Sequence, residues 1–285
     1  MNHKLGINFD EISPNVDISI KFMKEHNLYF GELRTVYNKN FVFWSPTEIK
    51  NFKYKIENSG IEIVSVASPL FKWYRNFDDP EIVHDSFGFN PRLDLNQKKD
   101  YIKRTIDIAN ELNVSKIRIF SGLGKTKNAA EIFVGDPLLD FALDYANQAK
   151  IDLLLENEPV CIINSPAEIV KVFELNNHNR LKFWFDVANL IELNSDITIN
   201  FIKSISPRLM YIHLKDYALA DGIKQYVPVG EGIIDYSKII HKILKYSKNE
   251  LIFTVETHAK INKYEMSSRT IMATRLLLNS EGIKV

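Results

Sequence analysis

The sequence has 285 residues, of which 45% are hydrophobic and 25% are charged. That length fits one large domain, and that composition is typical of a globular protein with a large buried core, which excludes a disordered chain. Lys and Arg together number 36, as do Asp and Glu, so no overall charge draws the chain to nucleic acid or to an anionic membrane.

The N-terminal segment turns polar too early for a signal peptide, and no run reaches the roughly 18 apolar residues of a membrane span. We therefore expect a cytoplasmic protein with no membrane partner and no nucleic-acid partner.

Short apolar runs alternate with longer segments of helical periodicity along the whole chain. This alternation predicts repeated strand-helix units around a parallel sheet, that is, a single (β/α)8 TIM barrel over residues 1–285. Most of the runs are continuously apolar, as is typical of parallel strands that are covered on both faces. The expected strands are Leu5–Phe9, Tyr29–Leu33, Ile61–Ala67, Lys116–Phe120, Asp152–Glu156, Lys182–Asp186, Met210–His213 and Leu251–Glu256.

Start signals precede several of the helices that this alternation requires. Ser45-Pro46-Thr47-Glu48, Asp136-Pro137 and Ser165-Pro166-Ala167-Glu168 each place a capping residue before a proline suited to the first helical turn. Leu95–Leu112 carries apolar residues at helical spacing, which predicts a face packed on the barrel. Tyr264–Leu278 is expected to close the ring as the eighth helix.

Two expected connections are long, namely Ser68 to about Asn96 after the third strand and Tyr217 to Gly232 after the seventh. Both leave the carboxyl ends of strands, where barrel enzymes carry their active sites. Loops of this length in a compact domain are more often functional than incidental.

Four expected strands end in a residue that can bind a divalent metal: Glu156, Asp186, His213 and Glu256. They follow one another along strands five to eight, so a barrel would bring them to the same rim. Cys161 is the only cysteine in the sequence, so a metal site here must use carboxylates and imidazoles. Three carboxylates and one imidazole suit Mn²⁺, Mg²⁺ or Co²⁺ and tolerate Zn²⁺. Taken singly, each carboxylate could instead cap a helix or form an ion pair.

The chain resembles the xylose-isomerase-like barrel superfamily of sugar isomerases and epimerases, which also contains endonuclease IV. The resemblance covers nearly the whole chain and rests on the four strand ends, on His213-Leu-Lys-Asp216, and on the glycine-rich turn from Val229 to Asp235. It implies one divalent metal ion held by Glu156, Asp186, His213 and Glu256. It also implies a small sugar or polyol as substrate and a homo-oligomeric state.

The resemblance further implies a reaction by proton transfer. A chelated carbonyl and its neighbouring hydroxyl acidify the adjacent C–H, so that an enediolate can form. In ketose 3-epimerases the two glutamate ligands exchange the proton, and this role is expected here for Glu156 and Glu256. The chain departs from the epimerase pattern at Asn189, where those enzymes have a histidine three residues after the aspartate. We therefore expect a sugar isomerase or epimerase, without choosing between them.

Further side chains are expected near the substrate. Glu158 and His258 lie two residues beyond a ligand and share its direction if the strand continues, but either could instead orient another side chain. Lys215 shares the direction of His213 and could neutralise an enediolate, with a surface lysine as the alternative. Arg34 could bind substrate, although we favour an internal ion pair with Glu32 across the barrel mouth. Trp73, with His84, could form an aromatic wall over a sugar ring, or could simply pack locally.

Three other functions stay open. A metal-dependent lyase of the inosose or dehydroshikimate dehydratase type begins with the same proton removal beside a carbonyl. An endonuclease IV-like nuclease would need several more histidines, and the ends of strands three and four supply none. A binding barrel without turnover is disfavoured because all four ligand positions are intact.

Overall fold

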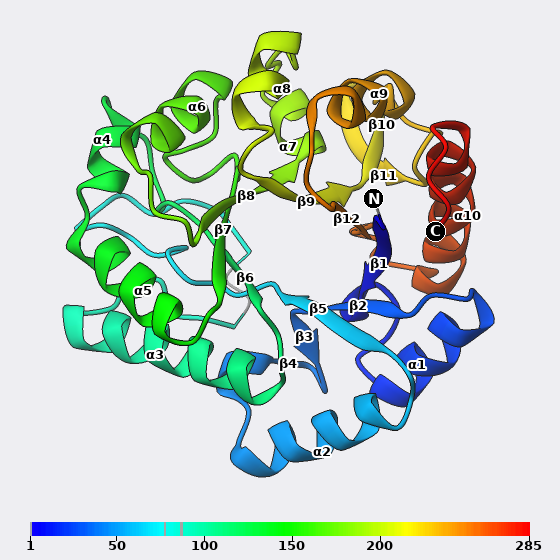
Figure 1. The fold of residues 1–285 in the computed structure, drawn as a ribbon, viewed down its shortest axis with the longest axis horizontal. Coiled ribbons are helices and arrows are strands. Elements are labelled where there is room, and N and C mark those ends of the chain that lie inside the picture. The colour runs from blue at the N-terminus through cyan, green and yellow to red at the C-terminus, as the bar shows by residue number, and fades with distance from the viewer. Residues whose placement is uncertain (1, 77, 86–87) are drawn as a thin grey trace.

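The computed structural model describes residues 2–76, 78–85 and 88–285. Within these residues, eight parallel strands close into a barrel surrounded by helices (Figure 1). Around the barrel the order is β1-β12-β9-β8-β7-β6-β5-β2, so the last strand of the chain pairs with the first. The strands are β1 (Lys4–Asn8), β2 (Phe30–Leu33), β5 (Glu62–Val66), β6 (Lys116–Ile119), β7 (Asp152–Glu156), β8 (Leu181–Asp186), β9 (Leu209–Leu214) and β12 (Ile252–Val255). The predicted TIM barrel is confirmed.

The helices follow the strands in alternation, and their start signals act as expected. In α2 the Ser45 side chain accepts from the backbone N–H of Glu48, and the Glu48 side chain accepts from the backbone N–H of Ser45. No helix in the described ranges has both the length and the apolarity to cross a membrane. The helices are α1 (Val16–Glu25), α2 (Pro46–Glu57), α3 (Leu95–Glu111), α4 (Ala129–Val134), α5 (Pro137–Gln148), α6 (Pro166–Leu175), α7 (Val187–Glu192), α8 (Ile199–Ile205), α9 (Tyr236–Tyr246) and α10 (Lys263–Ser280), with short 3₁₀ turns at η1 (Phe9–Glu11) and η2 (Phe41–Phe43).

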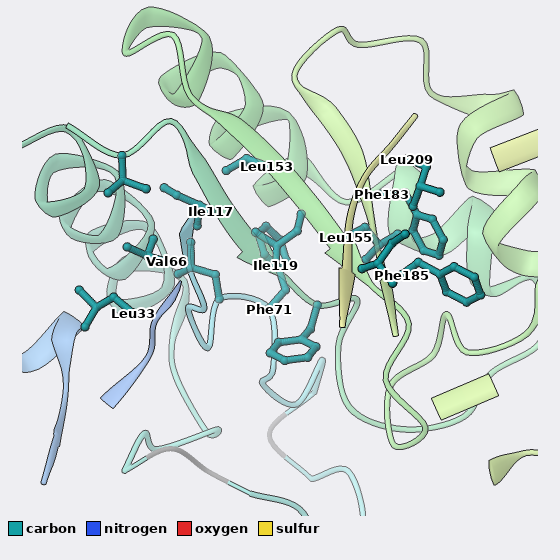
Figure 2. Close-up of a cluster of buried hydrophobic side chains, with 14 of the residues drawn as sticks. Leu33, Val66, Phe71, Ile117, Ile119, Leu153, Leu155, Phe183, Phe185 and Leu209 are labelled. Carbon is teal, nitrogen blue, oxygen red and sulfur yellow. The ribbon is translucent and has the colours of Figure 1, made fainter. Parts of the chain in front are cut away.

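Alternate residues of each strand face the helices and form the main core. Leu153 and Leu155 of β7 and Phe183 and Phe185 of β8 are fully buried in this layer (Figure 2). The intervening residues belong to a separate set: Leu154, Trp184 and Tyr211 form a second apolar cluster with Val64, Ala67 and Ile252. The rings of Trp184 and Tyr211 stack with centroids 3.6 Å apart. Residues two apart on a strand point to the same face. This cluster therefore lies directly beneath the inward-pointing polar residues at the strand ends.

The long connection after β5, expected from Ser68 to about Asn96, carries no helix in its described part and ends where α3 begins. Positions 77, 86 and 87 of this connection lie outside the described residues. Tyr74 and Leu123 form an isolated β-bridge, and Leu123 forms a second one with Cys161. The connections after β5, β6 and β7 are therefore joined to one another at the carboxyl end of the barrel.

The connection from Tyr217 to Gly232 differs from the expected loop. An antiparallel pair occupies much of it, namely β10 (Asp216–Ala220), which begins one residue earlier, and β11 (Ile223–Val227). Asp221 and Gly222 make the turn with φ of 51° and 77°. Two positive φ values suit a two-residue hairpin turn, for which Asp-Gly is a preferred sequence, so the signal was present in the chain. The small pair β3 (Thr35–Val36) and β4 (Lys39–Asn40) makes a second, shorter hairpin.

Candidate metal centre

Glu156, Asp186, His213 and Glu256 converge at the carboxyl end of the barrel. Each offers one ligand atom, and these four atoms all lie within 4.8 Å of one another. β8 and β9 pair in a register that sets Asp186 beside His213, and the backbone N–H of Glu256 donates to the Leu214 carbonyl at 3.1 Å. All four side chains are buried. The barrel thus brings together the four residues that were predicted as ligands.

The donor atoms of the cluster lie close enough together to bind one cation in common. Nδ1 of His213 lies 3.2 Å from Oε1 of Glu156, 3.2 Å from Oε2 of Glu256 and 3.7 Å from Oδ2 of Asp186. Among the described residues, Nδ1 of His213, Oε2 of Glu156 and Oδ2 of Asp186 are buried without a hydrogen bond of good geometry. Converging carboxylates are costly to bury unless a cation compensates them. The donor set therefore fits a divalent metal ion.

Basic side chains surround the cluster. Nζ of Lys215 lies 2.7 Å from Oδ2 of Asp186 and 3.4 Å from Oε2 of Glu256. Arg118 contributes Nη1 at 3.1 Å from Oε2 of Glu156. These cations form close ion pairs with the carboxylates of the cluster, and the pairs are shielded from water.

The charges of the cluster also shift the pKa values of Glu256 and Lys215. Burial by itself opposes the charged form of each group, but the attraction of His213, His258, Lys215 and Arg34 holds the pKa of Glu256 well below its usual value. Burial likewise opposes the charge of Lys215, and the attraction of Asp186 and Glu256 outweighs it and raises the pKa of the ammonium. Glu256 is thus a carboxylate and Lys215 an ammonium near neutral pH.

The expected pair between Glu32 and Arg34 is wrong. Glu32 lies inside the barrel, where its Oε2 is hydrogen-bonded to Nε2 of His213 at 2.9 Å. Arg34 lies beyond the end of β2, where its guanidinium reaches Asp10 at 2.8 Å, Glu11 at 3.2 Å and Glu256 at 2.5 Å. The two side chains lie at different depths, so each meets a different set of partners.

The predicted substrate residues divide into two groups. Arg34, Glu158, Asn189, Lys215 and His258 line a cavity of about 200 Å³ together with Glu156 and Glu256. The Asn189 side chain is already engaged, because its amide donates to the Asn157 carbonyl at 2.9 Å.

Trp73 lies elsewhere, which corrects its expected place over the substrate. Its ring packs against Phe71 at 4.9 Å and contributes to a different cavity, which Lys98 also lines. Phe71 belongs to the same connection, so Trp73 packs locally, which is the alternative that the sequence left open. His84, from the same connection, does line the cavity with the glutamates.

Among the lining residues that were not anticipated from the sequence, two are buried bases, Lys72 and Arg118. Lys72 is buried, with Nζ 3.1 Å from Oε1 of Glu158. In the run Lys-Ile-Arg-Ile of β6, the two isoleucines point to one face and Arg118 to the other, toward the inside of the barrel. A charged residue between two buried apolar ones could have indicated a site residue. Lys72 lies in a connection without regular structure, so no periodicity indicated its direction.

Comparison with known proteins gives one family and several structures of the same fold. The model of a family described as xylose isomerase-like TIM barrel matches residues 20–273. No curated protein matches the sequence. Similar solved structures include a probable 3-DHS dehydratase, AsbF, involved in petrobactin synthesis in Bacillus anthracis, with 16% identity, a TM-score of 0.72, and coverage of 95% of this chain and 98% of that one.

Two further structures have the same fold. The IOLI protein with a bound zinc atom shares 15% identity, with a TM-score of 0.75 over 97% of this chain and 98% of that one. An L-ribulose 3-epimerase shares 13% identity, with a TM-score of 0.73 over 98% of this chain and 95% of that one. These likenesses show the fold.

Proposed function

We propose that this chain, which belongs to the xylose isomerase-like TIM barrel family because the family model matches residues 20–273, is a divalent-metal-dependent sugar isomerase or epimerase. The observation that carries the proposal is the convergence of Glu156, Asp186, His213 and Glu256 within 4.8 Å at the carboxyl end of the barrel. Active sites of barrel enzymes are built at that end.

The four residues would hold one divalent ion, such as Mn²⁺, Mg²⁺, Co²⁺ or Zn²⁺. When bound, such an ion draws electron density from a carbonyl and its neighbouring hydroxyl and thereby acidifies the adjacent C–H. Glu156 ends β7 and Glu256 follows β12, and β8 and β9 lie between these two strands, so the glutamates approach the centre from two sides. One glutamate removes the substrate proton, and the other returns a proton to the opposite face or to the neighbouring carbon.

Charged neighbours would assist this transfer. Lys215 carries its ammonium beside Asp186 and Glu256, where it stabilises negative charge that develops on the substrate oxygens. Because these residues are buried, little water screens that stabilisation. Glu158, Asn189 and His258 line the same cavity and are proposed to hold substrate hydroxyls.

A metal analysis combined with a proton-exchange assay tests the proposal. Elemental analysis of the purified protein is expected to find one divalent metal per chain, and the Glu156→Gln variant is expected to lose it. In deuterated water, one ketose of a panel is expected to gain deuterium at a carbon next to its carbonyl. Glu231→Gln, which alters an exposed ion pair with Arg269, is the matched control and should retain metal and exchange. No bound metal after reconstitution would overturn the proposal.

A dehydratase acting on a cyclic keto acid is the second candidate. Lys72, Arg118 and Lys215 line the cavity, and each is paired with a carboxylate of the chain that a substrate carboxylate would replace. Both reactions begin with proton removal beside a carbonyl, but the dehydratase then loses a β-hydroxyl. The appearance of ultraviolet absorption from a conjugated product, with no deuterium in recovered substrate, would favour the dehydratase.

A further inference from the structure

A second cavity adjoins the candidate metal centre at the carboxyl end of the barrel. It has a volume of about 680 Å³, against about 200 Å³ for the cavity at the glutamates. Pro159 and Val160 line both cavities. In the connection after β5, Ile82 lines the larger cavity and the next residue, Val83, lines the smaller one. The two spaces therefore adjoin each other, with Pro159 and Val160 at the border.

Apolar residues form the larger part of the wall of this cavity, and other parts of the chain hold them in place. The polar lining residues are Arg75, Asn76, Asp79, Lys125 and Thr126. Leu123 and Ile162 are buried, and Leu123 forms the bridges that join Tyr74 and Cys161. The hydroxyl of Tyr74 accepts from the backbone N–H of Ile82 at 2.7 Å, which fixes this part of the connection beside the cavity. Apolar walls of this kind favour an apolar ligand group.

The basic residues of the larger cavity lie at its rim. Arg75 and Lys125 are both exposed, as is Thr126. A phosphate between exposed lysine and arginine side chains would stay in contact with water and gain little. A hydrocarbon or aromatic group bound against the apolar residues, in contrast, would be removed from water, which is favourable.

From these observations we infer that the substrate is a keto-sugar carrying an apolar substituent at the end remote from its carbonyl. The carbonyl end occupies the cavity beside Glu156 and Glu256, and the substituent passes Val160 into the larger cavity lined by Ile82, Leu123 and Ile162. This inference rests on the proposed function for the position of the carbonyl, and it adds the substrate class.

The test compares each D-ketohexose with its terminal O-benzyl ether and its terminal phosphate. Binding to the manganese-loaded protein is measured by ligand-observed NMR titration, which needs no turnover, and deuterium exchange is measured in parallel. We expect the benzyl ether of at least one ketohexose to bind roughly tenfold more tightly than the parent sugar, because its ring leaves water. Equal affinity, or a phosphate ester that binds more tightly than the benzyl ether, would overturn the inference.

Two variants locate the benzyl group. Ile82→Trp and Thr126→Trp fill the larger cavity from different walls and are expected to abolish the advantage of the ether while leaving the parent sugar unaffected. Leu276→Trp, on an exposed position of α10, is the matched control and should keep the advantage. If the advantage survives in both filling variants, the substituent binds elsewhere and the inference is wrong. A binding advantage without exchange in any sugar would contradict the proposed function but leave the apolar subsite standing.

Discussion

Oε2 of Glu32 lies 2.9 Å from Nε2 of His213, and both side chains are fully buried. The same oxygen accepts from the hydroxyl of Tyr211 at 2.9 Å, and that hydroxyl accepts from Ser65 and Thr254. Because Nε2 is engaged with Glu32, Nδ1 is the nitrogen that faces the three carboxylates. A carboxylate that binds the second nitrogen of a ligand imidazole fixes its orientation and raises its basicity.

Replacing Glu32 is therefore expected to weaken metal binding although Glu32 is not itself a ligand. We predict that Glu32→Gln lowers the affinity for Mn²⁺ by roughly 10- to 100-fold, as for other residues that orient metal ligands. Competition with a fluorescent chelator measures the change. Glu62→Gln, which alters an exposed ion pair with Lys4, should have no effect. Unchanged affinity in Glu32→Gln would show that the carboxylate does not support His213.

Metal binding should stabilise the folded chain. An ion that binds only the native state at 100 times its Kd adds about 2.7 kcal/mol, which raises the Tm of a domain of this size by several degrees. Differential scanning calorimetry with added metal, followed by chelator, measures this shift. Asp186→Asn should remove most of it, because Asp186 supplies one of the converging oxygens. A Tm that responds to neither metal nor chelator would argue against the centre.

Lys215→Met is expected to separate catalysis from metal binding. The lysine lies 2.7 Å from Oδ2 of Asp186, so its removal takes away a cation that would compete with the proposed metal. We predict that kcat falls by roughly 100-fold or more while Mn²⁺ affinity is kept or increased. Glu256→Gln should reduce both quantities. Steady-state kinetics and chelator competition on the two variants provide the comparison, and full activity in Lys215→Met would exclude a role for its charge.

Arg34→Met should destabilise the fold, because Arg34 compensates Asp10, Glu11 and Glu256 in a buried setting. Loss of one partner from such a network costs about 3–5 kcal/mol. Urea unfolding at pH 7 measures the loss.

The loss in Arg34→Met should be smaller at pH 5. Burial already raises the pKa of Asp10, and removing the arginine raises it further. A carboxyl whose pKa is higher in the folded than in the unfolded state destabilises the fold when ionised, so stability recovers as the pH falls. A loss that is the same at both pH values would contradict this account.

Glu48 should show the opposite dependence. Hydrogen bonds from the Ser45 backbone and from Lys39 lower its pKa from 4.5 to about 2. Its contribution to stability is therefore fully present above pH 4.5 and is lost as the pH falls through 2. Carbon-detected NMR titration should give the pKa directly. Unfolding of Glu48→Gln should differ from wild type at neutral pH and converge with it in acid, and a constant difference would rule out the carboxylate as the cause.

The sequence alone determined the barrel and the convergence of four side chains. Alternating apolar runs and helical segments permit few arrangements other than a parallel barrel, and the carboxyl ends of its strands share one rim. Glu156, Asp186, His213 and Glu256 stand at or next to those ends, so the local pattern was enough to bring them together.

Only the tertiary structure decided the partners of the remaining residues. Arg34 and Glu32 are two residues apart, yet one reaches Asp10 and Glu256 while the other lies beneath His213. Trp73 could have lain over the substrate or packed locally, and it packs against Phe71 of its own connection. Spacing along a strand sets the direction of a side chain, whereas depth in the barrel and the path of a long connection depend on contacts far apart in sequence.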